Sequence, residues 1–89
     1  MQNHKKIALA ILKNFKADEL VRTRDIINVV QKEFPEVPRG SIIPYDYCIN
    51  HENRDPSSGK YHIFKKNLAI KGIYKVLDHS VIKKSCLNK

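Results

Sequence analysis

The sequence predicts an α+β domain of the winged helix-turn-helix class, with three helices and a C-terminal β-hairpin. Two observations indicate this. Apolar residues in the first half recur at spacings of three and four, the period of a helix, whereas after Tyr61 they alternate as in strands. At 89 residues the chain has room for one modest core, so we expect a single winged-helix-like domain over residues 1–89, with an undefined tail from about Asp78.

Apolar spacing indicates the first two helices. Residues 3–15 place their apolar side chains on one helical face, and the first of these residues, Asn3, is suited to cap the helix. A very short strand is expected at Leu20 and Val21. Thr23 then fits the N-cap of a second helix, which should end before Pro35 because the residue preceding a proline avoids the α region.

The remaining elements are a third helix and two strands. The helix is expected within residues 41–49, with Pro44 in its first turn, where a missing N–H costs nothing. The strands are expected at residues 61–64 and 73–77, with Tyr74 and Val76 on one face and a hairpin loop between the strands. Helix, short strand, helix, helix, strand, strand is the order of a winged helix-turn-helix domain.

Composition limits the classes of function. Seventeen Lys and Arg against nine Asp and Glu give a net charge of +8, which favours an anionic partner, most commonly nucleic acid. No apolar run approaches the roughly 20 residues that cross a bilayer, and no signal-peptide pattern is present, so we expect neither a membrane partner nor export. Two cysteines are too few for a disulfide scaffold, which favours a reduced, cytoplasmic protein.

One stretch resembles a known family. Residues 41–50, SIIPYDYCIN, followed by Asn53, resemble small winged-helix-like bacterial domains with the pattern Ile-Pro-x-Asp-Tyr-Cys-x-Asn, found alone or fused to restriction-type nucleases. Gly72-Ile73-Tyr74 with Leu77 behind it is similar to the Gly-x-Tyr before a Leu in the hairpin of that family. The resemblance covers residues 23–77 and implies a winged helix that binds DNA in a bacterium or phage.

The sequence departs from this family at two places. His51 stands where an arginine is common, and the hairpin loop, residues 67–71, is more apolar than the Gly- and Arg-rich tip typical of the family.

A winged helix would turn residues 38–75 toward DNA, and these carry seven basic and three acidic side chains. Lys65 and Lys66, at the end of the first strand, are expected to hold phosphates together. Tyr45 is expected to be exposed, and Asn50 either reads a base or ends the third helix in a left-handed conformation. The residues expected to contact double-stranded DNA are Arg39, Ser41, Tyr45, Tyr47, Asn50, Arg54, Lys60, Lys65, Lys66 and Lys71.

Catalytic and metal sites are not indicated. Cys48 and His51 have a ligand-like spacing, but no second close pair accompanies them, so Cys48 is better interpreted as a small buried hydrophobe. His51, Asn53 and His62 only loosely follow the order of a His-Asn-His nuclease, and His62 is expected to face water from a strand. We therefore expect no enzymatic activity, no cofactor and no metal.

The alternative to DNA binding is a protein-interaction module on the same fold, either an accessory subunit or an inhibitor, and a homodimer is also open. Such a module would bind through Tyr45, Tyr47 and the hairpin. A continuous basic face beside the third helix would favour DNA, whereas an apolar patch there would favour a protein partner.

Overall fold

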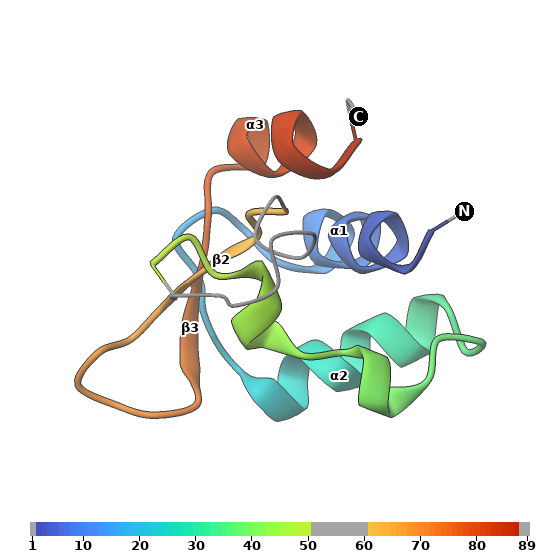
Figure 1. Ribbon diagram of the computed structural model, residues 1–89, viewed down its shortest axis with the longest axis horizontal. Helices are drawn as coiled ribbons and strands as arrows, with labels where there is room; N and C mark the ends of the chain where they lie inside the picture. The colour runs from blue at the N-terminus through green and yellow to red at the C-terminus, as the bar shows by residue number, and fades with distance from the viewer. Residues whose placement is uncertain (1, 51–60, 88–89) are drawn as a thin grey trace.

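The computed structural model describes residues 2–50 and 61–87. Within them the chain forms an α+β fold of three α-helices and a three-stranded antiparallel sheet (Figure 1). The elements in chain order are α1 (Asn3–Asn14), β1 (Leu20–Arg22), α2 (Thr23–Glu33), the 3-10 turns η1 (Arg39–Ser41) and η2 (Pro44–Tyr47), β2 (Phe64–Lys66), β3 (Ile73–Val76), α3 (His79–Ile82) and the π-helical turn η4 (Lys83–Leu87).

The first two helices are confirmed, and their starts each differ from the expected cap. Gln2, not Asn3, is the N-cap of α1, and no side chain caps that helix. Arg22, not Thr23, precedes α2, and its backbone N–H donates to the Asp25 carboxylate at 3.1 Å. Asp25 in the first turn therefore reaches back to the residue before the helix, as the acid of a capping box does.

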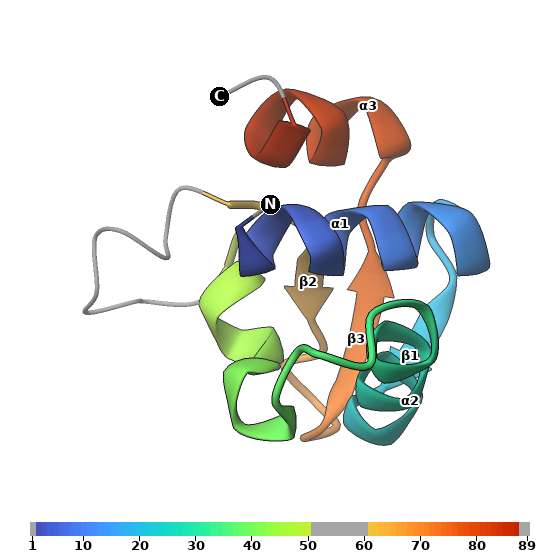
Figure 2. The same ribbon diagram turned by 90° about the vertical axis from the view of Figure 1, so that its right-hand side faces the viewer.

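The sheet has the order β1-β3-β2, so β3 is the central strand. Its register pairs Val21 and Lys66 with Tyr74 on one face, and Leu20 and Lys65 with Lys75 on the other. Tyr74 and Val76 are buried on the same face, as predicted. Figures 1 and 2 show the helices gathered on that side of the sheet, with α1 between α2 and α3. On the opposite face Leu20 and Lys65 are exposed and Lys75 is half-buried.

The predicted third helix is wrong. Residues 41–49 contain only the end of η1 and the single turn η2, although Pro44 does begin that turn. The reason is a tertiary pairing. The Ile63 N–H donates to the Tyr47 carbonyl and the Ile49 N–H donates to the Phe64 carbonyl, both at 2.9 Å. The backbone after η2 therefore runs beside β2 and uses there the groups that a helix would bond internally.

The expected C-terminal hairpin is also changed. The strand predicted at residues 61–64 begins only at Phe64, because the His62 N–H donates to the Ser85 hydroxyl at 2.6 Å and the Ile63 N–H bonds to Tyr47. His62 is thus half-buried ahead of β2 and not a water-facing strand residue. β2 and β3 do pair antiparallel, but β3 also pairs with β1, so the unit is a three-stranded sheet.

The segment predicted as an undefined tail from about Asp78 forms the helix α3 and the turn η4. The Asp78 side chain accepts the Ser80 backbone N–H at 2.9 Å and so caps the start of α3. Ile82 and Cys86 from this tail are fully buried. The tail therefore completes the core. No helix in the part of the chain that the structure describes has the length and apolar character needed to cross a membrane.

Candidate nucleic-acid interface

Four lysines lie on the ribbon, which we define as β2, β3 and the loop of residues 67–72 between them: Lys65, Lys66, Lys71 and Lys75. Figure 1 shows this loop projecting away from the helices. Successive side chains of a strand point to opposite faces, so Lys65 and Lys66 lie on opposite sides of the ribbon. They were expected to act as one pair. The pleat separates them, and each has a different set of neighbours.

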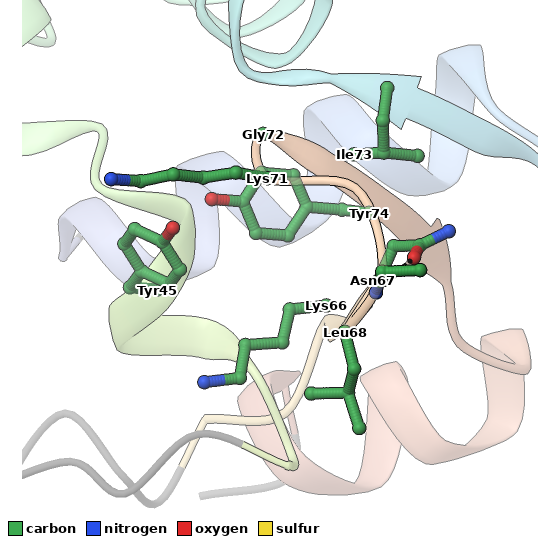
Figure 3. Close-up of a pocket in the computed structure, with 9 residues that line it drawn as sticks. Tyr45, Lys66, Asn67, Leu68, Lys71, Gly72, Ile73 and Tyr74 are labelled. Atoms are coloured by element: carbon green, nitrogen blue, oxygen red, sulfur yellow. Dashed lines mark hydrogen bonds between the residues drawn. The ribbon is translucent and has the colours of Figure 1, made fainter.

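The inner side of the ribbon carries Lys66 and Lys71 beside Tyr45. Together with Tyr74 these residues line one hollow (Figure 3). The Lys66 ammonium lies 5.9 Å from the centre of the Tyr45 ring, within the range of a cation–π contact. The Tyr45 ring in turn meets Tyr74 edge-on, with centroids 5.8 Å apart. Tyr45 is half-buried, contrary to the exposure expected for it, and its ring contacts the Lys66 ammonium.

Burial keeps the ionisable groups around this hollow protonated. It raises the pKa of Tyr74 to about 12; the hydrogen bond with Thr23 opposes this rise and the hydrogen bond with Tyr45 adds to it. It likewise raises the pKa values of Tyr47 and of the Cys48 thiol to about 12. At neutral pH all three groups are therefore uncharged, and the lysines carry the charge of the inner side.

Asn50 fixes the position of Lys66. Its amide donates to the Lys66 carbonyl at 3.1 Å and its carbonyl accepts the Lys66 N–H at 2.9 Å. This side chain thus satisfies both backbone groups at the open edge of β2, which an unpaired edge strand would present to other chains. Asn50 is not a left-handed helix end, because Asp18 is the one non-glycine residue with positive φ among the described residues. The base contact predicted for Asn50 stays a prediction, and its side chain bonds to the Lys66 backbone.

The outer side of the ribbon faces solvent. Lys65 and Lys75 stand directly opposite each other on neighbouring strands, and Leu20 stands opposite Lys75 on its other flank. These three residues line a second hollow together with the start of the loop. Like charges in direct cross-strand register repel. The Asp18 carboxylate lies 3.8 Å from the Lys75 ammonium and offsets this repulsion only in part. The outer side is therefore suited to an anion that lies between the two lysines.

The loop that joins β2 and β3 has an apolar tip, residues 68–70. Leu68 is 82% and Ile70 58% exposed. The loop is nevertheless ordered, because the Asn67 side-chain oxygen accepts the N–H groups of Ala69 at 2.9 Å and Ile70 at 3.0 Å. Gly72, with φ of 84°, then turns the chain back into β3, in a conformation that a residue with a side chain rarely adopts.

The other residues predicted to contact DNA fall into three groups. Arg39 is exposed and Ser41 half-buried on η1, and neither lines the hollows of the ribbon. Tyr47 is half-buried and packs against the core. Arg54 and Lys60 lie outside the described residues, as do His51 and Asn53. The site that the structure assembles is therefore the ribbon with Tyr45.

Sequence reasoning missed residues that complete this site, namely Leu20, Lys75 and the exposed pair Leu68 and Ile70. Lys75 is one of the seven basic residues between positions 38 and 75, but it is not among the residues predicted to contact DNA. The alternation of residues in the strands carried the missing information, but it becomes useful only once the register between strands is known.

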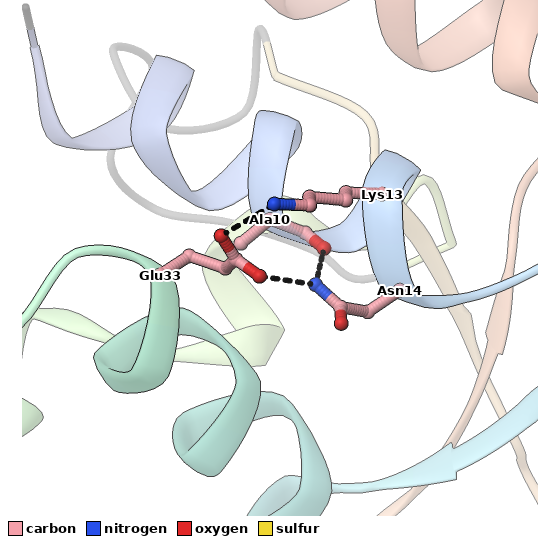
Figure 4. Close-up of polar contacts among 4 residues, drawn as sticks. All are labelled: Ala10, Lys13, Asn14 and Glu33. Atoms are coloured by element: carbon pink, nitrogen blue, oxygen red, sulfur yellow. Dashed lines mark hydrogen bonds and ion pairs between the residues drawn. The ribbon is translucent and has the colours of Figure 1, made fainter.

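A second polar cluster lies elsewhere and is structural. The Glu33 carboxylate at the end of α2 accepts from the Lys13 ammonium at 3.2 Å and from the Asn14 amide at 3.4 Å (Figure 4). These bonds lower the pKa of Glu33 and join the ends of α1 and α2. Cys48 and Cys86 are buried and not joined in a disulfide, and within the described ranges no three His, Cys, Asp or Glu side chains gather as a metal site would require.

Comparison with models of known protein families, with curated proteins and with solved structures finds no match to this chain.

Proposed function

We propose that this chain is a non-catalytic protein of the winged-helix class that binds double-stranded DNA through the ribbon. The observation that carries the proposal is the distribution of four lysines over both sides of one projecting ribbon. Lys66 and Lys71 lie on its inner side, and Lys65 and Lys75 on its outer side. A projection with cations on both sides can approach phosphates of both strands, which border a groove of the duplex.

The order of helices and strands is compatible with a winged helix, and the resemblance of residues 23–77 to small bacterial domains of that class points the same way. In such a domain the segment between α2 and β2 supplies the helix that reads bases. Here that segment consists of two 3-10 turns. We therefore expect binding to depend mainly on phosphate contacts, with little dependence on base sequence.

Binding that depends on phosphate contacts predicts a measurable dependence of affinity on salt concentration. Each neutralised phosphate contributes about −0.9 to the slope of log K against log salt, so four ribbon lysines give about −3.6. Between 50 and 200 mM salt the affinity should then fall on the order of 100-fold. A protein whose charge only keeps it in solution would show no such dependence on ribbon residues.

The test is a salt series of duplex binding by fluorescence anisotropy. The variants remove one side of the ribbon at a time, Lys65→Ala with Lys75→Ala, or Lys66→Ala with Lys71→Ala. Lys83→Ala with Lys84→Ala is the matched control, since it removes the same charge from exposed residues of the C-terminal turn. Each ribbon variant should flatten the slope by about two units, and the control should leave it unchanged. Equal effects of all three variants would contradict the proposal.

The exposed apolar tip favours a second candidate function, a protein-interaction module such as an accessory subunit or inhibitor. Leu68 and Ile70 form an exposed apolar surface of the kind that marks protein interfaces. This function becomes the better one if the wild-type protein shows no salt-dependent binding to any duplex.

A further inference from the structure

The loop tip holds apolar side chains in water at a cost that the fold does not explain. Leu68 and Ile70 contribute little to the core, being 82% and 58% exposed. A disordered loop could turn such side chains inward, but the bonds from Asn67 to Ala69 and Ile70 fix the turn. The structure thus presents a short, pre-ordered apolar projection, and such a feature points to a contact outside the chain.

The surroundings of the tip limit what that contact can be. Two lysines lie on each side of the ribbon from which the tip projects. The cores of protein interfaces are depleted of lysine, so this composition is unlike a protein-binding centre. A second copy of the chain is disfavoured for a different reason, because its own net charge of +8 would repel the lysines beside the tip. An anionic partner that also offers an apolar slot fits both features.

Duplex DNA has such a slot. The minor groove is about 6 Å wide, and proteins that bind it frequently insert Leu or Ile between base steps and kink the duplex. A two-stranded ribbon with its side chains is wider than this groove, so the exposed side chains of Leu68 and Ile70, and not the strands, are the part that would enter it. The lysines of its two sides would then lie beside the phosphates of the two DNA strands.

We infer that the tip is a wedge that inserts Leu68 between two base pairs, with Ile70 beside it, and that this chain bends the DNA to which it binds. This inference rests on the proposed function, which it extends from phosphate binding to deformation of the duplex. Unstacking a step costs a few kcal/mol, and flexible pyrimidine–purine steps such as TA cost least. The wedge therefore predicts a preference for TA steps without any base-specific hydrogen bond.

Two duplexes of equal length test the wedge, one with a central TA step and one with a stiff A-tract. Each carries a donor and an acceptor dye at its ends, and a third duplex carries 2-aminopurine at the TA step. The wild-type protein should raise energy transfer between the ends, raise the 2-aminopurine fluorescence by unstacking it, and bind the TA duplex more tightly than the A-tract.

The wedge variant is Leu68→Ser with Ile70→Ser. It should abolish the bend, the 2-aminopurine signal and the preference for TA, while the slope of log K against log salt stays that of the wild type. Leu68→Met should keep all three signals because it preserves an apolar side chain. Ile43→Ser is the matched control, since Ile43 is 44% exposed but precedes η2 and does not line the ribbon. It should behave as the wild type does.

The outcomes separate the two proposals. Salt-dependent binding by the wild type without a bend or 2-aminopurine signal overturns the wedge and leaves the proposed function intact. A bend that persists in the double serine variant also overturns the wedge, because another part of the chain must then cause it. If the wild-type protein binds no duplex, the proposed function fails and the wedge fails with it. Binding to phosphatidylserine vesicles that is lost in the double serine variant, with DNA bending unchanged, would assign the tip to a membrane instead.

Discussion

The two sides of the ribbon carry two lysines each, but these lysines differ in how far the rest of the protein holds them in place. On the inner side, Lys66 lies over Tyr45 and its backbone is held by Asn50. On the outer side, Lys65 stands opposite Lys75; Lys65 is exposed and Lys75 half-buried. The comparison shows how one pleated element can serve two purposes. Its inner side is part of the core and places a charge firmly, while its outer side is free to change without loss of the fold.

The largest expected effect contrasts the two sides in stability. Tyr74 is 2% exposed on the inner side and Leu20 is 64% exposed on the outer side. Tyr74→Ala should lower the free energy of unfolding by about 3–5 kcal/mol, the cost typical of deleting a large aromatic side chain from a core. Leu20→Ala should change it by no more than about 0.5 kcal/mol. Urea unfolding measures both values, and a similar loss in the two variants would remove the distinction between the sides.

A smaller effect is expected from the support beneath Lys66. Asn50→Ala leaves the N–H and carbonyl of Lys66 without their partners, so it should cost about 1–3 kcal/mol of unfolding free energy. Asn67→Ala is the control, because it removes hydrogen bonds that are exposed and should cost about 0.5–1.5 kcal/mol. Faster amide exchange at Lys66 in the Asn50 variant alone would show that the inner side depends on this contact. Equal exchange in both variants would contradict it.

The smallest effect comes from pH and should not distinguish the two sides. His4, on α1, is buried and stacks on Tyr61 with ring centres 3.7 Å apart, and this burial lowers the pKa of His4 below its ordinary value of 6.5. The unfolded chain therefore binds a proton more readily than the folded one below about pH 6.5. This contribution to stability should be fully present above that pH and decline as the pH falls below 6.5.

His4→Gln should flatten this decline in urea unfolding, whereas Leu20→Ala and Asn50→Ala should keep it. A decline that is unchanged in the His4 variant would mean that another group titrates. Glu33, Glu36 and Asp78 contribute only at lower pH, because hydrogen bonds lower the pKa values of all three carboxyl groups.

Local sequence patterns predict those parts of the fold that local forces determine. The apolar periods of α1 and α2 and the alternation in β3 are visible in the chain and are confirmed. The third helix could not be excluded in this way, because the pairing of residues 47–50 with β2 joins distant segments. The start of α3 did carry a signal, since aspartate is a preferred N-cap residue and Asp78 occupies that position.

The site was predictable in composition and not in arrangement. The basic excess on residues 38–75 covers the segment that contains the ribbon, and the contact with DNA predicted from it stays a prediction. Lys65 and Lys66 are adjacent in sequence, which suggested a single contact, yet strand geometry sends them to opposite sides. Asn50 illustrates the same limit, because its role depends on a backbone 16 residues away. Deciding which side chains of neighbouring strands share a face requires the register between those strands, which no local pattern contains.

The central claim is that duplex DNA contacts both sides of the ribbon at once. Its most direct test is a titration of the ¹⁵N-labelled protein with a short duplex, followed by two-dimensional NMR at low salt. Amide shifts should move at Lys65 and Lys75 and also at Lys66 and Lys71, and should return as salt is added. The amides of the C-terminal turn, Lys83–Leu87, should stay in place. Shifts confined to one side of the ribbon, or larger at that turn than on the ribbon, would contradict the account.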